Sequence, residues 1–326
     1  MSILDRLNIL KQKRQEIAPK LYKFKTRFSL LGTVGAGKTT VGGGLLISAQ
    51  TLSSMMPEFR CRVLEGSSGI RVAASNLRRG RFPPKTPANL PSAPEAGLLL
   101  YWGGLFGEKK VQIPFCDISG ERVQQVIQKY GEGMYPTEEA YDELSMLMRY
   151  IYDADGLILV IPASRALIFT DDRKVEAEPT GIAEDPDVNL ARILESVFEY
   201  KEETGSKKLK AILAIITKWD LLQPYAKSKK MDIQDPTGEG LQNFMDIAFP
   251  DTMMSLKAYG LENVRFFPSY FKVKRETVEI NGKKQVRLAK WSDGGDRIEM
   301  HEKILRMPKF PERTYKNMFD CLKNLA

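Results

Sequence analysis

The chain has 326 residues, of which 43% are hydrophobic and 28% charged, so it can form one large α/β domain or two smaller ones. Its single histidine, His301, excludes a clustered-histidine metal site. Cys61, Cys116 and Cys321 are too scattered for a disulfide framework or a zinc site. The formal net charge of +8 suits anionic partners, although a basic surface that is merely soluble has the same composition.

Residues 1–22 have apolar side chains at helical spacing, among them Ile3, Leu7 and Leu10, with basic residues interspersed. This pattern predicts a basic amphipathic helix, which either packs on the following domain or docks on a membrane surface or a partner protein. The N-terminus lacks the apolar core of a signal peptide, and no apolar run is long enough to span a bilayer. We therefore expect a cytoplasmic protein, either free or attached peripherally to a membrane.

Residues 23–326 are expected to form one α/β domain. Six apolar segments have the composition of buried strands, and they lie at 27–32, 59–65, 110–118, 156–163, 211–220 and 264–269. Helical patterns at 38–56, 138–153 and 188–203 lie between several of them. This alternation predicts a mainly parallel sheet with helices on both faces.

Two further stretches predict antiparallel hairpins. Glycines within 97–115 can turn a hairpin at the edge of the sheet. Asn281-Gly282 is a strong hairpin-turn signal and predicts a peripheral insertion near 270–300. A last helical pattern at 312–326 is expected to close the sheet.

The segment "GTVGAGKT" runs from Gly32 to Thr39 and matches the phosphate-loop pattern G-x-x-x-x-G-K-[ST], between an apolar strand and a predicted helix. Its glycines let backbone N–H groups turn toward phosphate oxygens, and the helix N-terminus adds a partial positive charge. We expect Lys38 to bind the β- and γ-phosphates and the Thr39 hydroxyl to bind Mg²⁺. The glycine run at 42–44 has no functional explanation in the sequence.

Two other predicted strand ends carry polar motifs. "DISGE" at 117–121 places Asp117 where a carboxylate can hold Mg²⁺ through water, and Gly120 where a backbone N–H can meet a γ-phosphate. "TKWD" at 217–220 places Asp220 where it can accept hydrogen bonds from the N1–H and 2-amino group of guanine, a donor pattern that adenine lacks. The stem of Lys218 can lie against the base. Each of these two motifs alone is weak evidence. Their occurrence after the phosphate loop, in this order along the chain, makes the combination specific.

With these three motifs in this order, the chain resembles the translation-factor class of P-loop GTPases, which includes Ras-like and dynamin-like proteins, over roughly residues 27–271. "DADGLILVIP", from Asp153, looks like the strand that lies between the second and third motifs of that class. The resemblance implies a three-layer P-loop NTPase fold, GTP or GDP as ligand and Mg²⁺ as cofactor. A looser likeness, in the proline-rich loop and "DISGE", is to prokaryotic and phage double-GTPases.

The resemblance also implies roles for individual residues. The nucleotide-binding positions are Gly32, Val34, Gly35, Ala36, Gly37, Lys38, Thr39, Thr40, Thr217, Lys218, Asp220 and Ser269, the last in "FFPSY". The metal positions are Thr39, Thr86 and Asp117, and the catalytic positions are Lys38, Thr86, Gly120 and Glu121. Thr86, in the proline-rich loop "RFPPKTPAN", is the candidate first-switch threonine, and the alternative is a surface linker residue.

The sequence departs from that class at three places. Thr217 stands where asparagine is usual, a replacement that similar GTPases tolerate, and "FFPSY" lacks the usual Ser-Ala-Lys pattern. Glu121 stands where Ras-like proteins carry a water-orienting glutamine, and its charge argues against fast unaided hydrolysis. Arg78, Arg79 and Arg81 precede the first-switch candidate. One of them supplies an arginine finger, or all three are solvated or contact a partner.

The predicted function is a GTP-hydrolysing switch whose loops become ordered around the γ-phosphate and are recognised by a protein partner. The alternative is a GTP-binding assembly subunit that self-associates and has little turnover. A nucleotide or small-molecule kinase is a third possibility, which the guanine motif disfavours. No aromatic-basic module indicates nucleic-acid binding.

Overall fold

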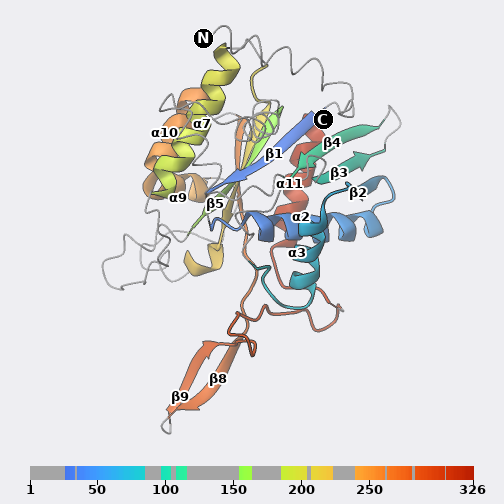
Figure 1. Cartoon of the computed structure of the whole chain (residues 1–326), viewed down its shortest axis with the longest axis vertical. Helices are drawn as coiled ribbons and strands as arrows, with labels where there is room; N and C mark the ends of the chain where they lie inside the picture. Colours follow the sequence, from blue (N-terminus) through green and yellow to red (C-terminus); the bar gives the residue numbers. More distant parts are fainter. Residues whose placement is uncertain are drawn as a thin grey trace, which may run out of the picture.

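The computed structural model describes residues 26–33, 35–84, 97–103, 108–115, 154–163, 185–203, 207–222, 239–260, 263–280, 283–304 and 306–326. The helices predicted at 1–22 and 138–153 lie outside these ranges. Seven strands form one sheet: β1 (Thr26–Gly32), β2 (Phe59–Val63), β3 (Gly97–Trp102), β4 (Lys109–Pro114), β5 (Gly156–Pro162), β6 (Ala211–Thr217) and β7 (Val264–Pro268). Their order is β2-β3-β4-β1-β5-β6-β7 (Figure 1).

The sheet is mostly parallel, as the alternation of strands and helices predicts. β1 pairs in parallel with β4 and with β5, and the parallel pairing continues from β5 through β6 to β7. The predicted hairpin is confirmed as an antiparallel pair, because β3 and β4 pair from Gly97 opposite Pro114 to Trp102 opposite Lys109. Its predicted place at the edge of the sheet is wrong, because β2 pairs with the outer side of β3. The chain is therefore a mixed α/β protein whose parallel strands all end at one edge of the sheet.

β2 corrects one expectation. Its segment is a strand, but an edge strand that pairs only with β3, rather than a strand buried on both faces. Phe59 is buried against Trp102 and Phe319, with ring centroids 5.3 and 5.8 Å apart, while Arg60 and Arg62 point to solvent. The alternation of apolar and basic residues in "FRCRV" is the signal of a half-exposed strand.

Helices cover both faces of the sheet. One face packs on α2 (Lys38–Met55), α3 (Ser68–Arg78) and α11 (Glu312–Leu325), and the other on α7 (Pro186–Glu203), α9 (Glu239–Ala248) and α10 (Pro250–Tyr259) (Figure 1). Leu30 and Leu31 show the division, since these neighbours on β1 belong to the two different apolar clusters. Helices α3, α9 and α10 were not predicted from the sequence. For α3, the buried positions 70, 73, 74 and 77 do have helical spacing.

The structure explains the glycine run at the start of α2. A Cβ on Gly42 would lie 2.6 Å from the ring of Phe115, and one on Gly43 would lie 3.1 Å from the backbone of α3. A Cβ on Gly44 would lie 2.7 Å from the Tyr315 hydroxyl of α11. The absence of side chains at these three positions therefore lets three different parts of the protein pack against one turn of α2. This close packing favours glycine there despite its low helix propensity.

A segment that follows β7 leaves the body of the protein and returns. It contains β8 (Arg275–Ile280) and β9 (Lys283–Leu288), which pair antiparallel and project away from the sheet (Figure 1). The base of this hairpin is tied together by backbone hydrogen bonds, including Lys274 N–H to the Arg297 carbonyl at 2.7 Å. None of the helices within the described ranges combines the length and apolarity that a membrane crossing requires.

Candidate functional site

The loop between β1 and α2 has the backbone geometry of an anion cradle. Gly35 and Gly37 have φ angles of 69° and 91°, which favour glycine, and α2 begins directly afterwards at Lys38. The Lys38 ammonium donates hydrogen bonds to the carbonyl oxygens of Gly32 and Thr33, at 2.9 and 3.0 Å. These two bonds hold the ammonium against the loop, beside the N-terminus of an 18-residue helix. The buried Thr33 hydroxyl has no hydrogen-bond partner within the described part of the chain.

Thr217, the last residue of β6, joins this loop to the "TKWD" segment. Its hydroxyl lies 2.6 Å from the carbonyl oxygen of Ala36 and 3.2 Å from that of Ile161, and the side chain is buried. Because β1 and β6 run parallel on either side of β5, their carboxyl ends lie at the same sheet edge. The hydroxyl therefore links the end of β6 to the loop between β1 and α2.

The residues after Thr217 are held by the burial of Trp219. Trp219 packs edge-on against Phe244, with ring centroids 5.4 Å apart, and its backbone N–H donates to the Ser269 carbonyl. Its neighbours Lys218 and Asp220 are consequently left at the surface, Lys218 exposed and Asp220 half-buried. Lys218 has a φ of 57°, an unusual value for a residue other than glycine, so this turn is constrained by its surroundings.

Ser269 lies beside the same cavity as Lys218 and Asp220, but its N–H and its hydroxyl already form hydrogen bonds within the protein. Its N–H donates to the Ile216 carbonyl at 2.7 Å, and its hydroxyl is hydrogen-bonded to the Tyr315 hydroxyl at 2.8 Å. Burial raises the pKa of Tyr315 to about 12, so this phenol is neutral at physiological pH. Ser269 thus fastens the loop after β7 to α11.

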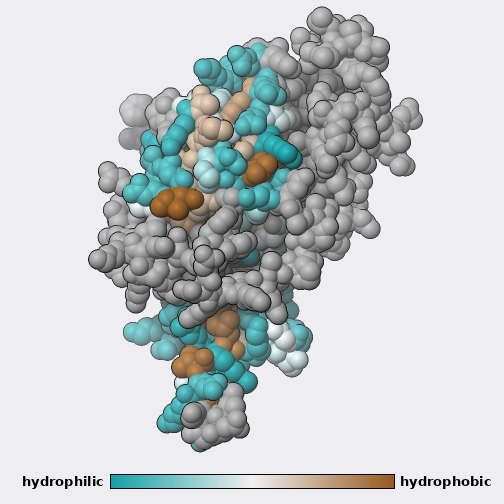
Figure 2. Space-filling view, turned by 90° about the vertical axis from the view of Figure 1, so that its left-hand side faces the viewer, coloured by the Kyte–Doolittle hydropathy of each residue, from teal (hydrophilic) through white to brown (hydrophobic). Residues whose placement is uncertain are grey.

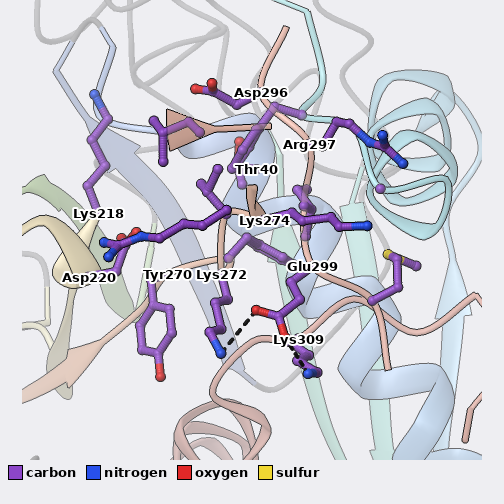
Figure 3. Close-up of a pocket in the computed structure, with 18 of the residues that line it drawn as sticks. Thr40, Lys218, Asp220, Tyr270, Lys272, Lys274, Asp296, Arg297, Glu299 and Lys309 are labelled. Atoms are coloured by element: carbon purple, nitrogen blue, oxygen red, sulfur yellow. Dashed lines mark hydrogen bonds and ion pairs between the residues drawn. The ribbon is translucent and has the colours of Figure 1, made fainter. Parts of the chain in front are cut away.

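A cavity of about 1160 Å³ opens beside these loops. Several of the predicted nucleotide-binding residues border it, namely Gly37, Thr40, Thr217, Lys218, Asp220 and Ser269. The opposite wall comes from the stretch between 270 and 309, including Lys272, Lys274, Arg297 and Glu299 (Figure 3). This wall was not predicted from the sequence. The basic residues of "FKVKR", which flank the hairpin, are the signal that could have indicated it.

Glu299 forms ion pairs with two lysines of this wall. Its carboxylate forms ion pairs with Lys272, at 3.0 Å, and with Lys309 (Figure 3). The hydrogen bond from Lys309, followed by that from Lys272, holds the pKa of Glu299 below its usual range despite partial desolvation. The same contact raises the pKa of Lys309. Two cations therefore share one carboxylate at this point.

Gly80 and Arg81, which precede the proline-rich loop, form hydrogen bonds and an ion pair with residues at the base of the β8–β9 hairpin. The Gly80 carbonyl accepts hydrogen bonds from the N–H of Ile298, at 2.8 Å, and from the indole N–H of Trp291, at 3.1 Å. The Arg81 guanidinium lies 4.3 Å from the Trp291 ring centroid and pairs with Asp293 at 2.5 Å. The N–H of Gly295 and the Arg81 guanidinium lower the pKa of Asp293.

Two of the three arginines that are candidates for an arginine finger already form contacts with other side chains of the protein. Arg78 donates to the Gln50 side chain at 2.6 Å, and Arg81 makes the contacts with Trp291 and Asp293. Arg79 lines the cavity, and its side chain makes no hydrogen bond or ion pair with any residue that the structure describes.

The remaining predicted site residues are Val34, Thr86, Asp117, Gly120 and Glu121, and all lie outside the described residues. Thr39 opens α2 next to Lys38. Within the described ranges, no group of three or more histidine, cysteine, aspartate or glutamate side chains could hold a metal ion. Magnesium bound by phosphate oxygens and a hydroxyl needs no such group.

No protein-family model matches the chain, and no curated protein matches its sequence.

Proposed function

We propose that the chain binds GTP with Mg²⁺ and hydrolyses it to GDP and phosphate, as a three-layer P-loop GTPase that switches a protein partner. The observation that carries this proposal is the hydrogen bond from Thr217 to Ala36. It brings the segment with the features of guanine recognition against the loop with the features of phosphate binding. Without this contact, the two motifs would be separate short patterns.

Guanine recognition is assigned to the β6 end of the cavity. The Asp220 carboxylate accepts hydrogen bonds from N1–H and the 2-amino group, and the Lys218 stem covers the base. Adenine does not offer this pair of donors to the carboxylate, which gives strong discrimination between the two bases. The hydroxyl of Ser269 is already bonded to Tyr315, so Ser269 positions the loop after β7 rather than contacting the base through that hydroxyl.

The triphosphate is assigned to the loop before α2. The φ angles of Gly35 and Gly37 let backbone N–H groups face phosphate oxygens, and the helix N-terminus favours the negative charge. Lys38 lies against this loop, and Thr39 supplies a hydroxyl to Mg²⁺. Thr86 and Asp117 are proposed to complete the metal site, which neutralises charge on the β- and γ-phosphates when Mg²⁺ is bound.

Hydrolysis requires a water in line with the γ-phosphate. We assign Gly120 to a backbone contact with that phosphate and Glu121 to the water. The negative charge of Glu121 near the triphosphate makes slow or partner-activated turnover the expected behaviour. Loss of the γ-phosphate would release the Thr86 and Gly120 loops, which is how a partner would distinguish the two states.

The test measures binding of fluorescent GTP, GDP and ATP to the full chain, followed by phosphate release. Guanine nucleotides should bind in preference to ATP, Lys38→Ala should abolish binding, and Asp220→Asn should weaken the preference for guanine. Lys316→Ala, an exposed lysine of α11, is the matched control and should change nothing. Equal affinity for GTP and ATP would refute the base assignment. A co-purified guanine nucleotide without turnover, including with Glu121→Gln, would indicate the assembly subunit instead.

A further inference from the structure

Among the described residues that line the cavity, basic side chains outnumber acidic ones. Seven are basic, Arg79, Lys218, Lys272, Lys274, Arg275, Arg297 and Lys309, and four are acidic, Asp220, Asp296, Glu299 and Glu302. Glu299 is taken by Lys272 and Lys309, and Asp296 pairs with Lys290, which is not part of the lining. Arg79, Lys274 and Arg297 form no ion pair with any residue in the described ranges.

Lys274 and Arg297 are held side by side. The Lys274 N–H donates to the Arg297 carbonyl at 2.7 Å, so the two residues are neighbours across the base of the hairpin. The Arg297 guanidinium stacks on Trp291, 4.6 Å from the ring centroid. Stacking engages the face of the guanidinium and leaves its in-plane N–H groups available for an anion. A phosphate group is the ligand that such a fork and a neighbouring ammonium bind well.

These cations lie away from the end of the cavity where the base is proposed to bind. Figure 3 shows Lys218 and Asp220 on one side, the ends of Lys274 and Arg297 on the other, and Thr40 of α2 between them. Lys38, which is assigned to the triphosphate, does not line the cavity. For a nucleotide with its base at Asp220 and its phosphates on the loop before α2, the ribose is the part that these positions leave without a partner, and Lys274 and Arg297 are cations of the same cavity without an assigned role.

From this arrangement we propose that the cavity takes a guanine nucleotide that carries a further phosphate group on its ribose, on the 2′ or 3′ oxygen, bound by Lys274 and Arg297. The inference rests on the proposed function, because it uses the base and phosphate positions assigned there. The volume of about 1160 Å³ exceeds the roughly 300–1,000 Å³ of ordinary ligand pockets, so there is room beyond a nucleoside. Such a phosphate belongs either to a free nucleotide or to the first residue of a triphosphorylated RNA.

The experiment compares matched ligands by calorimetry on the full chain at fixed ionic strength. One pair is GDP and GDP phosphorylated on the 2′ or 3′ oxygen, and the other is GTP and a 5′-triphosphorylated dinucleotide that begins with guanosine. We expect the added phosphate to improve affinity about tenfold or more in at least one pair. A gain in the first pair alone identifies a free nucleotide, and a gain in the second pair, with or without one in the first, identifies an RNA 5′ end.

Variants decide whether the named residues are responsible. Lys274→Ala and Arg297→Gln should each remove most of the gain and leave the affinity for GDP unchanged, which also shows that the variants are folded. Lys284→Ala, an exposed lysine of β9 that does not line the cavity, should retain the gain. Equal affinities within both pairs would overturn the inference while the proposed function stands. Failure of the wild-type chain to bind either GDP or GTP would overturn both.

Discussion

The Thr217 hydroxyl donates to the Ala36 carbonyl across 2.6 Å, and the two residues are 181 positions apart in the sequence. Both are buried, so neither group can turn to water instead. The carboxyl end of β6 and the loop that follows β1 are thereby joined at one place. The stability of this contact and the geometry of the candidate site are therefore linked.

Thr217→Val should lower the free energy of unfolding by about 1–2 kcal/mol, because the Ala36 carbonyl loses its donor in a buried setting. The valine keeps the shape of the threonine side chain, so packing is nearly unchanged. Thr217→Ser retains the hydroxyl and is the control. Urea unfolding followed by circular dichroism measures the difference. A valine variant as stable as the wild type would show that the bond contributes nothing.

Gly43→Ala should destabilise the protein by about 1–3 kcal/mol, because the added methyl would lie 3.1 Å from the backbone of α3 at residues 73 and 74. Backbone atoms cannot rotate away as a flexible side chain can. Gly103→Ala is the matched control, since its nearest contact would be an ordinary 3.7 Å. Thermal denaturation should separate the two variants. Similar melting temperatures would mean that α2 and α3 are not closely packed in solution.

Tyr315 should make stability depend on alkaline pH. Its folded-state pKa is raised to about 12, whereas an unfolded tyrosine titrates at about 10, so the unfolded state loses its proton first. The stabilisation is complete below pH 10 and is lost as the pH rises toward 12. Burial also raises the pKa of Cys61 to about 12, and this thiol contributes in the same direction.

The difference between wild type and Tyr315→Phe isolates the tyrosine, because both proteins retain Cys61. The phenylalanine variant loses the bond to Ser269, which costs about 1 kcal/mol near neutral pH. It should then lose less stability than the wild type between pH 10 and 12. Parallel pH profiles for the two proteins would contradict the assigned pKa.

Trp291→Ala should loosen the chain before the proline-rich loop, because the indole donates to the Gly80 carbonyl and stacks with Arg81 and Arg297. Amide hydrogen exchange should accelerate at residues 80–84, while β5 and β6 remain protected. Trp291→Phe preserves an aromatic ring but lacks the N–H, so it should have an intermediate effect. Unchanged exchange at 80–84 in the alanine variant would mean that this anchor is dispensable.

Apolar runs were sufficient to predict most of the sheet. The segments that became β5 and β6 are almost continuously apolar because helices cover both faces, and those that became β1, β4 and β7 contain shorter apolar runs. Both kinds of run are visible locally. The glycines before α2 and the lysine that begins it were visible for the same reason, since the pattern is contained in eight consecutive residues. The β8–β9 hairpin was indicated by the Asn281-Gly282 turn.

Only the tertiary structure showed what depends on residues far apart in the chain. The glycine run in α2 faces Phe115, α3 and Tyr315, and Ser269 is bonded to Tyr315, but none of these partners is close in sequence. The basic wall of the cavity likewise joins residues from 272 to 309 to the carboxyl ends of β1 and β6. Local composition determines whether a segment can be a strand, a helix or a loop. Which side chains meet is determined by how those segments pack, because burial and hydrogen bonding act between neighbours in space.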